Sequence, residues 1–403
     1  MKTILYLLIL LLPASLVCAQ VKDPFPYRFS SSIYERIKTD SASWRGGVTA
    51  SDLSFIGLYR QALQEWDKPR AGVRYLSAGD SIAFVTTYRP VDARAFILER
   101  AKENRVLIFN EAHYNPRHRV FVTSLLADLK KLGYTCLAAE TFANNPDFAE
   151  NSVCPTLNTG YYAMEPQFGN LIREANRLQL RLYPYEHRTG GNGRLREIEQ
   201  AKNLAALLSS NPDLRLIVYC GFSHIFEDSV AGWEKAMAGR LKELTGIDPY
   251  TIDQLVWSER SADSLNNPYY RMVQAKNYAI LADKQNIAFR KRPDGQQVDA
   301  LLYSPPTTYI HNRPGWIFEN GQRPFLISKD SVTVSYPFLA KVYFSESDIS
   351  NLVVPADMIE IGNEQELAVT AVAVYPDRGF IIELTDTTGK TQLIRPADPG
   401  KAK

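Results

Sequence analysis

The sequence has few cysteines, four in 403 residues, and their positions exclude a fold built on disulfides. Cys18 lies in an apolar N-terminal segment. Cys136 and Cys220 fall inside apolar runs that predict buried strands, where a free thiol behaves as a small hydrophobic group. Cys154 is far from any other cysteine or histidine. The cysteines therefore predict neither a disulfide framework nor a zinc site with closely spaced cysteine ligands.

The sequence also lacks the short motifs of several common enzyme classes. It contains no Gly-x-Ser-x-Gly motif, and Ser223 precedes a histidine instead of lying between glycines. It has no His-Glu-x-x-His, no P-loop and no glycine fingerprint of a dinucleotide-binding fold. The net charge is only +2 and both signs are interspersed, so no basic region predicts binding to nucleic acid. We therefore expect a small molecule or a peptide as the substrate.

After its N-terminus, the sequence has no apolar run long enough to span a membrane. The N-terminus itself has Lys2, an apolar core over 4–12 and small residues before Gln20, which is typical of a secretory signal peptide. The apolar core is shorter than the roughly 20 residues that cross a bilayer. We expect cleavage after Ala19, which removes residues 1–19 and exports the mature chain to the periplasm or the medium without a stable membrane anchor. A retained anchor is the alternative.

The mature chain is long enough for two or three domains, because one hydrophobic core rarely serves more than about 250–300 residues. Strand-like and helical patterns alternate in its middle part, which indicates a mostly parallel sheet with helices on both faces. Short strand patterns separated by turns follow and indicate a small all-β domain. We expect an α/β fold with these segments: a helical region at 20–94, an α/β domain at 95–314, a β-sandwich-like domain at 315–396 and a tail at 397–403.

Two helices are expected around the start of the α/β domain. Residues 51–66 have apolar side chains at helical spacing, and Ser51 is a residue type that begins helices. This pattern predicts one amphipathic helix over the whole segment. Residues 93–102 predict a second helix, which leads the chain into the first strand of the sheet.

Four apolar runs in the α/β domain each end in a carboxylate, an imidazole or both. Such runs predict buried parallel strands, and open α/β sheets bind their ligands beyond the carboxyl ends of the strands. The strand ends carry these groups: Glu111 and His113 after 106–109, Glu140 after 134–139, Glu186 and His187 after 180–185, and His224 after 214–220.

We expect five of these residues to meet in one catalytic site: Glu111, His113, Glu140, Glu186 and His224. Residues two apart in an extended chain share a face, so the first two can point into the same cavity. Glu186 and His187 are adjacent and point to opposite sides, and we favour Glu186. Each residue alone could instead form an ion pair, a helix cap or a buried histidine. Four strand ends with the same property make that alternative weaker.

We expect three further residues to contact a substrate. His118 lies at the start of the helix after Pro116, Arg119 follows it, and Arg188 follows the third strand. The two arginines would bind an anionic group of the substrate. Ion pairing that neutralises the carboxylates is the alternative for the arginines, and an exposed surface position is the alternative for His118.

The same constellation predicts a possible metal site. Glu111, His113, Glu140 and His224 would be the ligands, because carboxylates and imidazoles suit Mn²⁺, Zn²⁺, Co²⁺ or Fe. Crowded carboxylates raise one another's pKa, and a divalent cation relieves that repulsion. A metal with an open position would lower the pKa of bound water to about 7 and make it a nucleophile. Without a metal, a His/Glu pair would activate water as a general base.

The motifs resemble those of a known group of proteins over about 95–310. Asn110-Glu-Ala-His113 resembles a Gly-Glu-x-His element, Gly221-Phe-Ser-His224 resembles a Gly-x-x-His element, and Glu140 matches a glutamate after the second strand. These elements are typical of the superfamily of Tiki/TraB metalloproteases, ChaN-like haem-binding lipoproteins and erythromycin esterases. Asn110 stands where the group has its first glycine. Because asparagine tolerates unusual backbone angles, we expect the turn there to survive.

The resemblance implies an exported hydrolase that cleaves an ester or amide bond with activated water, with or without a divalent metal. A second hypothesis is a haem- or iron-binding protein without catalysis, since the group includes such proteins. Tyr114, Tyr161 and Tyr162 would be the nearby tyrosines for that role, because haem iron takes His or Tyr as an axial ligand. A third hypothesis is an interaction protein that keeps the scaffold without activity.

Overall fold

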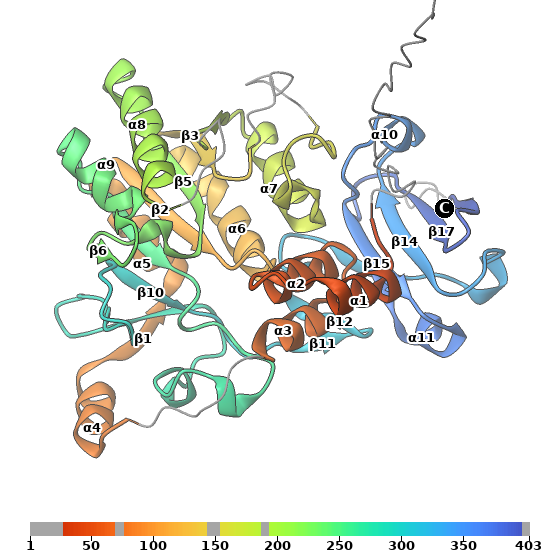
Figure 1. Ribbon diagram of the computed structural model, residues 1–403, viewed down its shortest axis with the longest axis horizontal. Coiled ribbons are helices and arrows are strands. Elements are labelled where there is room, and N and C mark those ends of the chain that lie inside the picture. Colours follow the sequence, from red (N-terminus) through yellow and green to blue (C-terminus); the bar gives the residue numbers. More distant parts are fainter. Residues whose placement is uncertain (1–26, 69–75, 143–153, 187–192, 397–403) are drawn as a thin grey trace, which may run out of the picture.

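The structure is a computed structural model that describes residues 27–68, 76–142, 154–186 and 193–396. The expected signal peptide, the expected tail, His187 and Arg188 lie outside these residues. Among the described helices, none combines the length and the apolar character that crossing a bilayer requires. Figure 1 shows a large α/β unit beside a smaller β-rich unit, with the N-terminal helices between them.

The four apolar runs form neighbouring strands of one eight-stranded sheet, whose order is β1-β9-β10-β8-β2-β5-β3-β4. All pairings among these four strands are parallel, and the predicted α/β class is confirmed. Their bounds are Val106–Glu111 for β2, Tyr134–Ala139 for β3, Arg181–Pro184 for β4 and Arg215–Gly221 for β5.

Four more strands widen the sheet on the β2 side. β8 (Tyr250–Asp253) and β10 (Ala300–Tyr303) continue the parallel part. β9 (Ala279–Ala282) and β1 (Arg89–Asp92) pair antiparallel and form the edge, which the sequence patterns did not predict. The α/β unit therefore begins before residue 95, with a strand from the N-terminal region.

Helices cover both faces of the sheet, as predicted (Figure 1). Leu107 and Phe109 of β2 join the core on one face, whereas Val106 and Ile108 join the core on the other. This division follows from the alternation of side chains along a strand. The first face carries α5 (Ala93–Glu103), α6 (Arg117–Lys131) and α7 (Pro166–Arg177), and the second carries α4 (Ala78–Thr87), α8 (Arg194–Ser210) and α9 (Met237–Thr245).

The path of the chain brings the ends of β2, β5 and β3 together. From β2 the chain passes through α6 to β3 and through α7 to the edge strand β4, both on one face. It then returns through α8 on the opposite face and inserts β5 between β2 and β3. Helices leave neighbouring strands toward opposite faces at this point, and such switch points are where open α/β sheets bind ligands.

The C-terminal unit is built on a four-stranded antiparallel sheet in the order β15-β14-β17-β18. Its strands are β14 (Phe338–Tyr343), β15 (Asp357–Ile361), β17 (Ile381–Asp386) and β18 (Thr391–Ile394). A hairpin of β11 (Tyr309–Ile310) and β12 (Arg313–Pro314) precedes the unit, and β13 (Arg323–Leu326) pairs with β16 (Ala371–Val374). Two short helices, α10 (Glu346–Ser350) and α11 (Glu364–Val369), complete it.

The N-terminal helices pack on the C-terminal sheet. They are α1 (Ser30–Thr39), α2 (Arg45–Phe55) and α3 (Tyr59–Asp67), and Leu53 and Phe55 of α2 share a core with Phe338 and Met358. The single helix expected over 51–66 is wrong, because the chain breaks between α2 and α3, and Ser51 lies inside α2. Gly57 allows the break with a φ of +75°.

Gly57 is also the point of closest approach between the N-terminal helices and β15. A Cβ atom at this position would collide with the carbonyl oxygen of Met358, and the neighbouring Ile56 carbonyl accepts the Glu360 N–H at 3.1 Å. The spacing of apolar residues in 51–66 cannot predict this contact, because the partner strand lies about 300 residues further along the chain. The contact explains why the helix pattern over 51–66 is interrupted.

The Gly57→Ala variant should lose stability. Holding a non-glycine residue at positive φ costs about 1–3 kcal/mol, and the collision with Met358 adds to it. Gly46→Ala is the matched control, because Gly46 lies in α2 with open space around its Cβ position, and this change should gain about 0.5–1 kcal/mol. Urea unfolding of both variants measures the difference, and equal stability of the two would contradict this account of the break.

Candidate functional site

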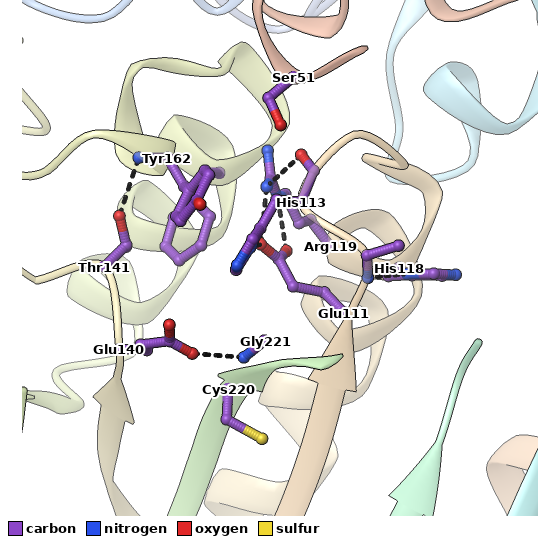
Figure 2. Close-up of polar contacts among 12 residues, drawn as sticks. Ser51, Glu111, His113, His118, Arg119, Glu140, Thr141, Tyr162, Cys220 and Gly221 are labelled. Atoms are coloured by element: carbon purple, nitrogen blue, oxygen red, sulfur yellow. Dashed lines mark hydrogen bonds and ion pairs between the residues drawn. The ribbon is translucent and has the colours of Figure 1, made fainter. Parts of the chain in front are cut away.

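The structure brings Glu111, His113, Glu140 and His224 together at the carboxyl ends of three adjacent strands. Figure 2 shows the first three of them. Glu111 ends β2, and His113 follows two residues later. Glu140 follows β3 directly. His224 lies in a short 3-10 turn, Phe222–Ile225, after β5. All four side chains are buried, with residue exposures between 2% and 9%.

The first half of the site is the pair of Glu111 and His113. His113 Nδ1 lies 2.8 Å from Glu111 Oε1, so the ionised carboxylate accepts the Nδ1–H proton and leaves Nε2 unprotonated in the neutral ring. The imidazole stacks on Tyr162, with ring centroids 3.5 Å apart. Its Nε2 edge faces Gly221, where a Cβ atom would collide with the imidazole and lie 3.1 Å from Glu140 Oε2. Only glycine leaves room for this arrangement.

Arg119 forms an ion pair with Glu111 and neutralises its charge. Its Nε donates to Glu111 Oε2 at 2.6 Å and its Nη2 to Oε1 at 2.7 Å, while Nη1 donates to Glu165 Oε2 at 2.9 Å. Burial alone would raise the pKa of Glu111, but the Arg119 guanidinium outweighs burial and holds that pKa well below its usual range. Arg119 is completely buried, so it serves as an ion-pair partner inside the protein and does not reach the surface.

The second half of the site is the pair of Glu197 and His224. His224 Nδ1 forms a hydrogen bond of 2.9 Å with Glu197 Oε2 and lies 2.7 Å from Oε1, and Oε2 also accepts the Met237 N–H at 2.8 Å. The imidazole stacks on Trp233 with a centroid distance of 5.3 Å and an interplanar angle of 15°. Burial opposes protonation of His224, but the negative charges of Glu140 and Glu197 outweigh it and raise the pKa of the imidazole.

Glu140 lies between the two pairs. Its Oε2 accepts the Gly221 N–H at 2.5 Å, and its Oε1 pairs with Arg196 and lies 3.6 Å from His224 Nε2. Burial would raise its pKa, but His224, Arg196 and His113 together lower the pKa to about 2. The carboxylate is therefore ionised over the whole neutral range and faces both imidazoles.

Glu186 lies on the outer side of Arg196. It accepts hydrogen bonds from Arg196 Nε and from Gln200 Nε2, each at 3.1 Å, and it also pairs with Arg196 Nη2. Arg196 therefore separates Glu186 from Glu140 and from the histidines. The side chain of Arg196 is 29% exposed, which makes it the most accessible of the charged groups around the site.

His118 does not lie at the rim. It is buried, its Nδ1 accepts the Ala112 N–H at 3.0 Å, and its Nε2 lies 2.7 Å from Ser258 Oγ. Burial lowers the pKa of His118 to about 3, so the ring is neutral. His118 thus stabilises the turn between β2 and α6. Arg188, the third residue expected to contact a substrate, is outside the described residues.

Asn110 acts through its side chain and not through an unusual backbone angle. It lies inside β2, where its Nδ2 donates to the Phe222 carbonyl at 2.8 Å and its Oδ1 accepts the Gln254 N–H at 2.8 Å. The positive φ in this region belongs to Phe222, at +40°. We expected Asn110 to be tolerated because asparagine accepts unusual backbone angles, and this reason is wrong. Asn110 has an ordinary strand conformation, and its side-chain amide connects β2 with the segments that follow β5 and β8.

Three important residues were not predicted: Glu165, Arg196 and Glu197. Glu165 caps α7 by accepting the Phe168 N–H, and Arg196 and Glu197 begin α8. One sequence signal was present, because Glu197 and Gln200 share a helix face with the apolar residues Ala201 and Leu204. Polar side chains on the buried stripe of a helix indicate a buried partner.

The carboxylates of this site are paired with arginines. Crowded carboxylates were expected to have raised pKa values, whereas the pKa values of Glu111 and Glu140 are lowered. Within the described residues, no group of three or more His, Cys, Asp or Glu side chains is arranged to hold a metal ion. A divalent ion would have to displace Arg196 from Glu140, so the residues as arranged do not fit one. The metal site stays a prediction.

No family model matches the sequence, and no curated protein matches it. Among solved structures, the type III effector HopBA1 is similar with a TM-score of 0.30 and 14% identity, covering 41% of this chain and 84% of that one. RRSP, a MARTX toxin effector domain from Vibrio vulnificus, has a TM-score of 0.29 and 14% identity, and the match covers 65% of this chain and 50% of that one. The C-terminal region of Pasteurella multocida toxin has a TM-score of 0.32 and 10% identity, and the match covers 90% of this chain and 50% of that one.

This chain spans about half the length of the last two structures. TM-scores near 0.3 at such identities carry no argument about function. The interpretation of the site therefore rests on its own geometry.

The pKa values of two buried histidines, His118 and His224, are shifted in opposite directions. His224 should remain protonated above pH 6.5, and His118 should stay neutral down to about pH 3. NMR of histidine-labelled protein measures both, with His224→Gln and His118→Gln to assign the signals among the five histidines.

The raised pKa of His224 also affects stability. Its contribution is fully present below the unfolded-state pKa of about 6.5 and is lost as the pH rises through the folded-state value. The stability difference between wild type and His224→Gln should therefore shrink above pH 6.5. A His224 signal that titrates at or below 6.5 would contradict the proposed pairing with Glu140 and Glu197.

Proposed function

We propose that this protein is an exported hydrolase that cleaves an ester or amide bond of a small molecule or peptide with a water molecule activated by histidine. One observation carries the proposal: two Glu–His pairs, Glu111–His113 and Glu197–His224, direct their Nε2 edges toward the single carboxylate Glu140. Each imidazole is oriented by a carboxylate on Nδ1, as in hydrolases whose histidine acts as a general base.

His113 is the general base of the proposed reaction. Its Nε2 takes a proton from water as the oxygen attacks the carbonyl carbon, and Glu111 stabilises the imidazolium that forms. Arg119 holds Glu111 ionised and fixed, so the carboxylate stays an acceptor throughout. His113 is also the more exposed of the two histidines, at 9% against 4% for His224.

His224 and Arg196 supply positive charge on the other side of Glu140. The charges of Glu140 and Glu197 raise the pKa of His224, and in the protonated imidazole Nε2–H can give its proton to the leaving group. Arg196 Nη1 lies 3.2 Å from the same nitrogen and can stabilise the developing oxyanion. After one turnover His113 holds the proton from water and His224 has lost one, and exchange with solvent restores both.

The resemblance to the erythromycin-esterase branch of the superfamily agrees with a mechanism that uses histidine and glutamate without metal. A haem-binding role is less well supported by the arrangement. An axial histidine needs room for a whole porphyrin at its ligating nitrogen, far more than a water molecule requires. The Nε2 edges of His113 and His224 face Gly221, Glu140 and Arg196 instead.

His113→Gln should reduce kcat for ester cleavage by about 10²–10⁴-fold while the protein stays folded, because loss of a general base has that effect. The mature chain from Gln20 should be tested on panels of esters and peptides. The control is His311→Asn, because His311 is exposed at a φ of +45°, which asparagine tolerates. Hydrolysis that survives His113→Gln at the wild-type rate would refute the assignment of the base.

The metal question has its own test. If Arg196 keeps its contact with Glu140, chelator should leave hydrolysis unchanged, and Mn²⁺, Zn²⁺ or Co²⁺ should not shift the melting temperature. A metal-dependent site would behave oppositely, since an ion at a hundredfold excess over its Kd stabilises a protein by about 2.7 kcal/mol. Loss of that stabilisation in His224→Ala would then assign the ion to this site. A Soret band on adding haemin, with no hydrolysis, would favour the haem hypothesis.

A further inference from the structure

A short hairpin places Trp233 against the face of His224. Its strands are β6 (Ser229–Val230) and β7 (Glu234–Lys235), and Trp233 lies in the turn between them. The indole and imidazole planes are nearly parallel, with centroids 5.3 Å apart. On the indole edge, a Cβ atom at Gly193 would lie 3.3 Å from Trp233 Cδ1, so the backbone at the start of α8 packs closely against the ring.

The hairpin is fastened to the two helices that enclose His224. Arg240 of α9 donates through Nη2 to the Trp233 carbonyl at 2.7 Å and through Nε to the Lys235 carbonyl at 2.8 Å. Arg194 of α8 pairs with Glu234 at 2.6 Å. The partly buried Arg240 contacts hold the backbone of Trp233 itself, whereas the Arg194 pair is exposed and contributes little stability.

His224 needs such a support to keep its ring plane. Nδ1 lies 2.7 Å from Glu197 Oε1 and 2.9 Å from Oε2, and a hydrogen bond tolerates a range of angles, so this contact restrains the χ2 torsion without fixing the ring plane. The χ2 torsion of histidine is broad, so torsional preference does not define the plane either. A flat aromatic face against the ring removes this freedom and keeps Nε2 directed toward Glu140. Tyr162 packs on His113 in the same way.

We propose that Trp233 is a positioning residue that fixes the plane of the His224 imidazole. The proposal rests on the proposed function, because His224 is the acid of that reaction. The contact that connects Trp233 with the site is its stack on His224, so we expect Trp233 to act through His224. Misplacing a catalytic group by about 1 Å can cost about 10²-fold in rate. Loss of the flat face should therefore lower kcat and leave KM nearly unchanged.

Kinetics of three variants test the proposal. Trp233→Leu keeps apolar bulk without a flat ring and should lower kcat by about 10–100-fold with KM within about twofold. Trp233→Phe keeps a flat face and should recover most of kcat. Arg240→Gln leaves Trp233 in place but frees its backbone, and should lower kcat to an intermediate value. Trp44→Leu is the control, because Trp44 is 70% exposed and lies at the start of α2.

NMR of the His224 ring tests the same proposal without any substrate. Ring-current effects of the indole should shift the His224 ring signals upfield in the wild type, and the shift should disappear in Trp233→Leu. Unchanged His224 signals in Trp233→Leu, or a lost shift with an unchanged kcat, would each overturn the proposal. If the wild type cleaves none of the substrates but shows the ring shift, the proposed function fails and Trp233 still orients His224.

Discussion

The pairing of buried charges is the constraint on which the whole site depends. Glu111, Glu140, Glu165 and Glu197 are all buried, and an unpaired buried carboxylate costs several kcal/mol. Arg119 pairs with Glu111 and Glu165, whereas Arg196 pairs with Glu140 and Glu186. His113 and His224 each contact a further carboxylate group through Nδ1, Glu111 and Glu197 respectively. Among the described residues of the site, acids and bases therefore alternate, with Arg119 between Glu111 and Glu165 and Arg196 between Glu140 and Glu186.

This alternation decides which chemistry the site favours. A cluster of bare carboxylates and imidazoles would attract a divalent ion, since a cation relieves their repulsion. Here the guanidinium groups already provide that relief at Glu111 and Glu140, whose pKa values are lowered. Two imidazole edges remain available, the Nε2 edges of His113 and His224, and they face Glu140 from opposite sides. This arrangement supports the proposed proton transfer by histidine.

Parts of the chain far from the sheet contribute to the surroundings of the histidines. Trp66 of α3 stacks on Tyr114 and on Phe222, and Phe222 makes an edge contact with His113 at a centroid distance of 5.0 Å. The helices that carry Trp66 are in turn held by the C-terminal sheet, with Gly57 against Met358. The C-terminal unit therefore supports the site indirectly, by holding the N-terminal helices in place.

The sequence by itself determined the parallel strands and the residues at their carboxyl ends. Apolar runs such as 106–109 and 214–220 must be buried on both faces, and alternation with helices implies parallel pairing, so Glu111, Glu140 and His224 were expected at one edge. Only the tertiary structure decided their partners. Arg196 and Glu197 lie on a helix that crosses the opposite face, and Arg119 reaches Glu165 across 46 residues. Periodicity reports which face of an element is buried, but the pairing of charges across elements depends on how those elements pack.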